Sequence, residues 1–358
     1  MNREKLTIVL TIKERKKYTK RYLDWLSLQN CPFRIIIADG DLCKNYTKRI
    51  LECDNYKNLS ITYIEYDYDK DLNCYMKKLA DVSKEVRTDF VIYADNDDFL
   101  LIDNLIKAVD IIDKNKNIGT LALSHYRLKI HAKDNSLNAM LSAHNSQISI
   151  QKLKRFGASD IVDSNSQIRL LSAIKNFPSD YIYYGIHRTD QFIRINNDLS
   201  GVVSRYWIFG EFYQTYAFAL SGRIYAIEAE PFLVRQENTS YHASQLVDSE
   251  KLSRLIVTDS WGEHRKNLAL SLWKLLIDKE GDMNKREFYK NFYKNFDQYV
   301  SKVIRSARIA NFFRPYQFFF RILRSINLRM RGRSRVNFRH QEVRKNESLL
   351  KLINFIRE

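Results

Sequence analysis

A short apolar run that ends in a cluster of aspartates places the strongest constraint on what this chain can fold into. Residues 90–94 are β-branched or aromatic apart from one alanine, and Asp95, Asp97 and Asp98 follow directly. Such a run, without helical period, is typical of a buried strand. Ligands of open α/β sheets bind at the carboxyl ends of the strands, so we expect these carboxylates to face a binding crevice.

The spacing of the three aspartates predicts a metal site. Carboxylates this close repel one another unless a cation lies between them. Oxygen ligands suit Mg²⁺ or Mn²⁺, which usually take one or two carboxylates and leave positions for substrate phosphates. The alternative is a solvated acidic turn before the helix expected from Asp103 to Lys114, because short motifs often occur by chance.

The first 118 residues alternate between strand and helix patterns. Crossovers of helical length join parallel strands, so this alternation predicts an α/β fold with a mainly parallel sheet flanked by helices. Charged residues follow the strands, with Arg15 after the first and Asp39 at the end of the second. The expected strands are Leu6–Ile12, Arg34–Ala38, Ser60–Tyr66 and Phe90–Ala94, and the expected helices are Thr19–Gln29, Tyr46–Cys53, Leu72–Val86 and Asp103–Lys114.

Residues 119–280 continue the globular unit less regularly. The run Gly119–His131 alternates like a strand, and the polar stretch Ala132–Ser166 is typical of an insertion such as a lid or an acceptor-side loop. A short strand is expected at Tyr181–Ile186. Gly210 and Glu211 are expected to open an apolar helix, and helices from Asp248 to Asn267 and on to Asp278 complete the unit near residue 280.

The chain carries a formal charge of +17, which favours an anionic partner. Much of this charge lies in residues 281–358, a C-terminal extension that is basic, aromatic and helical in pattern. Between residues 298 and 341 there are eleven Lys and Arg and no acidic residue, with bulky apolar residues interleaved. This pattern predicts an interfacial segment on an anionic membrane. The alternatives are packing on the main domain or RNA binding.

The sequence also predicts a cellular compartment. Its four cysteines show no C-x-x-C spacing, which is typical of reduced thiols rather than of a zinc site or disulfide frame. The N-terminus lacks a signal-peptide pattern, and no window reaches the ~18 apolar residues of a membrane span. We therefore expect a cytoplasmic protein.

Three motifs occur in an order found in one enzyme family. They are Thr7-Ile-Val-Leu-Thr-Ile-Lys-Glu-Arg15, Ile35-Ile-Ile-Ala-Asp39-Gly40 and Tyr93-Ala-Asp95-Asn-Asp97-Asp98-Phe99. Together they resemble nucleotide-sugar glycosyltransferases of the GT-A fold, specifically the family 2 type of bacterial polysaccharide synthesis. The resemblance covers residues 5–115 well and residues 180–245 more loosely.

The resemblance implies roles for individual residues. Asp39 would contact the nucleoside and Asp95 the ribose, while Asp97 and Asp98 would bind the metal. Glu211 would be the catalytic base that deprotonates the acceptor, although Phe212 stands where the family usually has an aspartate. Arg235 and His242 resemble the Arg and His that help to bind diphosphate or metal in the family, with His242 as a metal ligand. We also expect Arg15 at the donor site. The strand-end pair His187 and Arg188 is a candidate diphosphate site or a surface turn.

These observations predict a metal-dependent inverting glycosyltransferase that uses Mg²⁺ or Mn²⁺. Its donor would be a nucleotide sugar and its acceptor a glycan or a lipid-linked glycan at the inner face of the cell membrane. We weigh two alternatives. A non-catalytic relative would keep the fold, and Phe212 favours it. A nucleic-acid-binding protein would explain the charge, but it should carry its basic residues on the folded domain rather than mostly in the tail.

Overall fold

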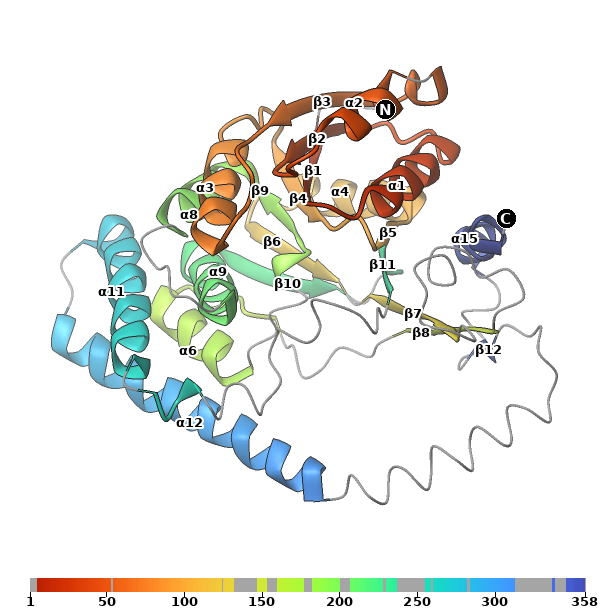
Figure 1. Ribbon diagram of the computed structural model, residues 1–358. Helices are drawn as coiled ribbons and strands as arrows, with labels where there is room; N and C mark the ends of the chain where they lie inside the picture. The colour runs from red at the N-terminus through yellow and green to blue at the C-terminus, as the bar shows by residue number, and fades with distance from the viewer. Residues whose placement is uncertain are drawn as a thin grey trace.

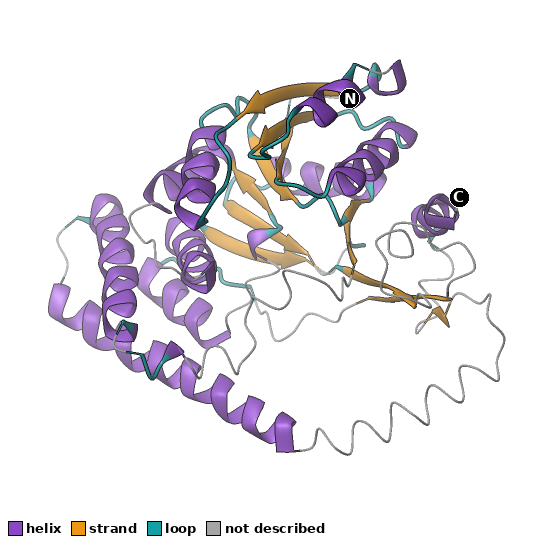
Figure 2. Ribbon diagram, viewed as in Figure 1, coloured by secondary structure: helices purple, strands orange, loops and turns teal. Residues whose placement is uncertain are grey.

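A seven-stranded sheet lies at the centre of the computed structural model (Figures 1 and 2). The structure describes residues 5–52, 54–123, 125–131, 147–152, 160–176, 182–199, 207–227, 230–236, 255–258, 260–281, 284–312, 337–338 and 346–357. The strand order is β10-β6-β9-β4-β1-β2-β3, and every neighbouring pair is parallel except those that β9 makes. The strands are β1 (Leu6–Ile12), β2 (Arg34–Asp39), β3 (Ser60–Glu65), β4 (Phe90–Ala94), β6 (Ile118–Leu123), β9 (Ile186–Arg188) and β10 (Arg223–Ile227).

Helices cover both faces of this sheet. Side chains alternate along a strand, so β1 sends Ile8 and Leu10 to one face and Val9 to the other. The first face packs against α1 (Lys16–Leu28), α2 (Asn45–Leu51) and α4 (Ile102–Lys114), and the second against α3 (Leu72–Ser83), α8 (Thr189–Leu199) and α9 (Trp207–Ser221). A short 3₁₀ helix, η1 (Asp54–Tyr56), follows α2. The predicted fold class, a mainly parallel α/β sheet flanked by helices, is confirmed.

The register of the central strands brings their carboxyl ends to one edge. Leu10 of β1 pairs with Ala94 of β4, and Ile12 of β1 pairs with Asp39 of β2. Asp95, the residue after β4, therefore lies at the same edge as Asp39, two strands away. Neighbouring strands are about 4.8 Å apart, so the two carboxylates can belong to one ligand site.

A second sheet extends from the turn after the aspartates. Its order is β12-β8-β7-β11-β5, formed by β12 (Asn337–Phe338), β8 (Gln147–Lys152), β7 (Tyr126–His131), β11 (Leu233–Gln236) and β5 (Phe99–Leu100). The run expected as one strand is thus two, β6 and β7, which belong to different sheets. The predicted insertion also contains a strand, β8, while its residues 132–146 and 153–159 lie outside the described part.

The C-terminal extension contributes to the core. In α12 (Lys285–Phe312), Phe288, Phe292 and Phe296 recur at every fourth position and pack against α9 (Trp207–Ser221) and α11 (Trp261–Glu280). The helix α15 (Glu347–Arg357) packs Leu352 and Ile356 against Trp25 and β7 beside the second sheet. Packing therefore does not break at the predicted boundary near residue 280. The membrane segment predicted from residue 298 begins inside α12, and its residues 313–336 and 339–341 lie outside the described part.

Some helices differ from the expected ones. Helices were expected from Asp248 to Asn267 and on to Asp278. Residues 248–254 and 259 lie outside the described part, and α11 runs without a break past Asn267 to Glu280. Two helices, α6 (Ser166–Asn176) and α8, were not expected from the pattern. Among the helices of the described residues, none combines the length and the apolar composition that a membrane span requires.

Candidate functional site

The three aspartates after β4 form a compact carboxylate cluster. One oxygen from each of Asp95, Asp97 and Asp98 lies within 4.8 Å of the others. The turn that carries them is fixed at both ends, because β4 lies in the central sheet and β5 pairs with β11 of the second sheet. Asn96, between them, is buried and donates to Thr19 Oγ1 at 2.9 Å. The cluster is therefore held on a rigid junction of the two sheets.

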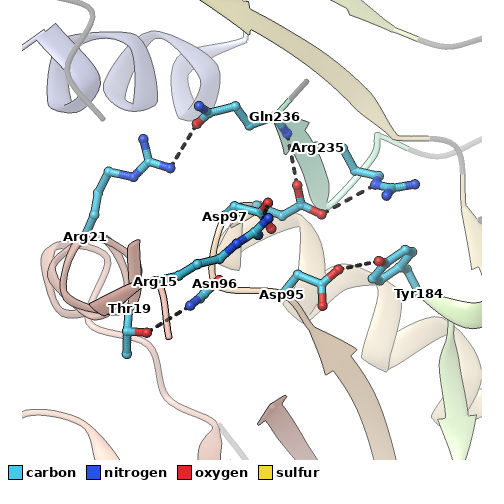
Figure 3. Close-up of polar contacts among 10 residues, drawn as sticks. Arg15, Thr19, Arg21, Asp95, Asn96, Asp97, Tyr184, Arg235 and Gln236 are labelled. Carbon is cyan, nitrogen blue, oxygen red and sulfur yellow. Dashed lines mark hydrogen bonds and ion pairs between the residues drawn. The ribbon is translucent and has the colours of Figure 1, made fainter. Parts of the chain in front are cut away.

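Asp95 and Asp98 are oriented by neighbours from other elements (Figure 3). Asp95 accepts a hydrogen bond from the hydroxyl of Tyr184, which precedes β9. Asp98 Oδ1 accepts from the backbone N–H of Gln236 at 3.0 Å. The Gln236 side chain in turn accepts from the buried Arg21 at 2.9 Å. Residues of β11, α1 and the turn before β9 thus hold two of the three carboxylates, those of Asp95 and Asp98, in place.

Two arginines from distant parts of the sequence contact the cluster. Arg15 Nη1 lies 2.6 Å from Asp97 Oδ2, and Arg235 Nε lies 3.5 Å from Asp98 Oδ2 (Figure 3). The Arg235 guanidinium also lies 4.7 Å from the centre of the Tyr184 ring. The structure thus brings both predicted arginines, Arg15 and Arg235, to the aspartates, although more than 200 residues separate them in sequence.

The electrostatics of the cluster favour a cation. Burial raises the pKa of Asp95, and the charge of Asp97 raises it further. Burial also raises the pKa of Asp98 well above its usual range, with Arg235 acting in the opposite direction. A bound divalent cation would favour the ionised form of both groups. The donor atoms are carboxylate oxygens, which fit Mg²⁺ or Mn²⁺, and Asp97 and Asp98 would hold the ion. The third predicted ligand, His242, lies outside the described residues.

Asp39 lies at the same sheet edge and is fully buried. Its Oδ1 accepts from the Asp41 backbone N–H at 2.8 Å, and its Oδ2 accepts from the Tyr63 hydroxyl at 2.7 Å. These two bonds hold the carboxylate in place at the end of β2. Its predicted contact with the nucleoside of a donor remains a prediction.

A buried ion pair lies next to Asp39. Asp69 and Lys78 contact each other with side chains 3% and 1% exposed, and Lys78 Nζ also donates to the Ile12 carbonyl at 3.1 Å. The backbone of Gly40 approaches this pair so closely that a Cβ there would lie 2.4 Å from Asp69 Oδ2. Only glycine fits at this position without displacing the Asp69 carboxylate. The pair therefore fixes the chain after both β1 and β2.

The prediction that His187 and Arg188 lie in the donor site is wrong. Because β9 runs antiparallel to β4, Arg188 pairs with Phe90, the first residue of β4. At ~3.3 Å per residue it lies about 13 Å from the carboxyl end of that strand. Its Nε donates to the Ile118 carbonyl at 2.8 Å, so it braces the turn before β6.

His187 is a core residue. It is fully buried, with its ring stacked 3.8 Å from that of Phe218, and burial lowers its pKa to about 3. Its Nε2 lies 3.3 Å from the Tyr183 carbonyl, which can only accept, so this nitrogen carries the proton. Nδ1 is then free to accept from the Thr120 hydroxyl at 3.1 Å. The imidazole is neutral and structural, with no role at the carboxylate cluster.

Glu211 lies in the second turn of α9, since the helix already includes Trp207 and Gly210. The predicted helix start at Gly210 is therefore wrong. The charge of Glu211 adds to burial in raising the pKa of Tyr299 in α12. Phe212 is buried against Phe296, with ring centroids 5.1 Å apart. The role of Glu211 as base remains a prediction.

Several residues of the site could not be foreseen. No local sequence pattern indicates that Tyr184 and Gln236 contact the aspartates, because the fold alone brings these distant segments together. Arg21 carried a weak signal, because it falls among the apolar positions of α1 that face the core. Burial lowers its pKa to about 10. A charged residue on the buried side of a helix indicates a specific partner, which here is the side chain of Gln236.

No model of a known protein family and no curated protein sequence matches this chain. Among solved structures it is similar to S. aureus TarS 1-349 in complex with UDP-GlcNAc, at 14% identity and a TM-score of 0.46 over 85% of this chain and 83% of that one. It is also similar to the mannosyltransferase PcManGT from Pyrobaculum calidifontis in complex with GDP-Man and Mn²⁺, at 12% identity and a TM-score of 0.40 over 87% and 88%. Both are likenesses of fold.

Proposed function

We propose that this protein is a metal-dependent, inverting glycosyltransferase that transfers a sugar from a nucleoside-diphosphate donor to a glycan or lipid-linked acceptor in cell-surface polysaccharide synthesis. The observation that carries the proposal is the carboxylate cluster at the edge where the strands end. It offers oxygen ligands only, and Arg15 and Arg235 lie beside it. Anionic ligands that bring a divalent cation, such as nucleoside diphosphates, fit this combination of charges.

The residues around the cluster have separate tasks in this proposal. Asp97 and Asp98 hold Mg²⁺ or Mn²⁺, which when bound stabilises the charge that develops on the departing nucleoside diphosphate. Arg15 and Arg235 add positive charge next to the same diphosphate. Asp95 contacts the ribose, and Asp39 contacts the nucleoside from the neighbouring strand end.

Glu211 is our candidate for the base that takes the proton of the acceptor hydroxyl. A positioned base contributes about 10²–10⁴-fold to such a step, so Glu211→Gln should slow transfer by at least about 10²-fold while donor binding stays unchanged. The measurement is nucleotide release from a panel of nucleotide sugars with Mn²⁺ and a glycan acceptor. Glu263→Gln, at an exposed position of α11, is the control. Unchanged transfer by Glu211→Gln would remove this residue from the mechanism.

A non-catalytic relative that binds nucleotide or glycan is the alternative function. The observation that favours it is Phe212, which stands where the family usually has an aspartate and is buried among aromatic rings. The same assay distinguishes the two functions. Donor binding without nucleotide release, whatever the acceptor offered, would support the non-catalytic reading.

We further propose that the protein works at the inner face of the cell membrane. Beyond the sequence of residues 298–341, the support is a cationic stripe on α12, defined by the exposed residues Arg286, Lys290, Lys294, Lys302 and Arg305. They lie opposite the phenylalanines that α12 buries. The exposed Glu287 is the one acid on the same side of the described helix, and Asp297 is paired with Arg265. Each cation near an anionic leaflet contributes about 1 kcal/mol, so the stripe can hold this side of the protein on the lipid surface.

Charge reversal of the stripe should weaken lipid binding. With Lys290, Lys294 and Lys302 all replaced by glutamate, we expect binding to phosphatidylglycerol vesicles to fall by at least about tenfold in co-sedimentation at physiological salt. The control replaces Lys57, Lys84 and Lys116, which are exposed elsewhere, by glutamate. Equal losses in the two triple variants would show that net charge alone matters, and the stripe would then have no special role.

A further inference from the structure

We propose that Arg15 is an internal counter-ion of the metal site: it holds Asp97 in the metal-free protein and is released to the donor's diphosphate when a divalent cation binds. Metal and donor would then bind cooperatively, because the cation releases Arg15 from Asp97 and the released Arg15 binds the donor's diphosphate. This inference rests on the proposed function. It adds that Arg15 changes its partner from Asp97 to the diphosphate when the metal binds.

The ion pair between Arg15 and Asp97 is built differently from the other ion pairs near this sheet edge. Its atoms are 2.6 Å apart, and its side chains remain 25% and 15% exposed. By contrast, Asp98 is 6% exposed and bound by the Gln236 backbone, and the Lys78–Asp69 pair is almost completely buried. Arg235 is 32% exposed, but its release would leave the buried Asp98 without a cation, whereas release of Arg15 leaves only the partly exposed Asp97 without one.

The backbone aims Arg15 at the cluster at some cost in conformational energy. Glu14 and Arg15 both have left-handed backbone angles, with φ of 56° and 54°. Such a conformation costs a non-glycine residue roughly 1–2 kcal/mol. Arg15 is also the N-cap of α1, and its guanidinium, which has no acceptor for the free N–H groups of the helix, donates to Asp97. Two successive residues in this conformation direct the side chain away from α1 and onto the carboxylates.

The charges around Arg15 suit an exchange of partners. The first turn of α1 contains no acidic residue but does contain Lys16 and Lys17, so positive charge meets the positive end of the helix dipole. This arrangement favours an anion at the start of α1. The structure supplies that negative charge to Arg15 through the ion pair with Asp97, and Arg15 also interacts with the charge of Asp95. After a cation has bound Asp97, a diphosphate bound beside the cluster would supply the negative charge to Arg15.

A binding experiment with Mn²⁺ tests this exchange without any measurement of activity. Free hydrated Mn²⁺ is followed by electron paramagnetic resonance, with and without UDP, GDP, ADP or dTDP, on the full chain and on Arg15→Asn. Asparagine tolerates the left-handed conformation, so the variant should keep the start of α1. The control, Lys17→Gln, removes one exposed positive charge from the same helix turn.

We expect Arg15→Asn to bind Mn²⁺ alone about tenfold more tightly than the unaltered protein, because no cation competes for Asp97. The effective nucleotide should raise the affinity for Mn²⁺ at least about tenfold in the unaltered protein and in Lys17→Gln, but much less in Arg15→Asn. Equal or weaker binding of Mn²⁺ alone by Arg15→Asn would overturn the inference and leave the proposed function standing. Absence of Mn²⁺ binding by the unaltered protein with every nucleotide would overturn both.

Discussion

Replacing Asp98 by asparagine is expected to lower the rate of sugar transfer by about 10³-fold or more. Asparagine keeps the oxygen that accepts from the Gln236 backbone at 3.0 Å, so the turn between the two sheets should persist. The variant removes the negative charge that would hold the cation, and stabilisation of a leaving group by a metal is worth several kcal/mol. Each 1.36 kcal/mol corresponds to a tenfold change in rate, which gives the expected size of the loss.

The measurement is nucleotide release at saturating Mn²⁺, compared with Asp103→Asn. Asp103 is exposed in the first turn of α4, five residues further along the same segment, so its replacement should leave the rate almost unchanged. The unfolding midpoint of Asp98→Asn shows whether the fold is kept. A folded Asp98→Asn variant with more than a tenth of the original rate would show that this carboxylate is not a metal ligand.

Replacing Lys78 by methionine is expected to destabilise the folded protein by about 3–5 kcal/mol, because it leaves the buried Asp69 without its cation. Burial already raises the pKa of Asp69 and lowers the pKa of Lys78, so each charge depends on the other. Asp69 Oδ1 is buried with no hydrogen-bond partner among the described residues. Domains are typically stable by only about 5–15 kcal/mol, so this is a large fraction of the total.

Urea unfolding at neutral pH measures the effect, with Lys77→Met as the matched control. Lys77 is the exposed neighbour on the same helix, and its replacement should change the free energy of unfolding by less than about 0.5 kcal/mol. The double variant Asp69→Asn with Lys78→Met removes both charges and should recover at least half of the loss. A Lys78→Met protein as stable as Lys77→Met would mean that the pair does not hold the strand ends together.

The sequence was most informative where local burial decides the structure. The strand Phe90–Ala94 has the predicted bounds, because a short run rich in β-branched and aromatic residues, without helical period, favours a buried strand. The parallel pairing of β1, β2 and β4 followed from the lengths of the crossovers, and it brought Asp39 and the three aspartates to one edge. Arg15 and Arg235 were assigned to the same site, and both lie against the cluster.

Prediction failed where tertiary contacts decide. Nothing in the run before His187 shows that β9 enters the sheet antiparallel, and that direction alone moves Arg188 to the far end of β4. Tyr184 acts at Asp95 for the same reason, since the chain must pass the cluster before it turns into β9. The pattern also did not show that the start of the C-terminal extension packs on the main domain, where α12 buries Phe288, Phe292 and Phe296.

The most direct test of the metal and donor site is the thermal stability of the protein against a panel of nucleoside diphosphates and nucleotide sugars, with and without Mn²⁺. A ligand at a hundred times its dissociation constant adds about 2.7 kcal/mol, which raises the unfolding midpoint by several degrees. We expect a shift with one class of nucleotide that requires Mn²⁺ and disappears in Asp97→Asn. No shift with any of them, or an equal shift in Asp97→Asn without Mn²⁺, would contradict a metal-dependent donor site at these aspartates.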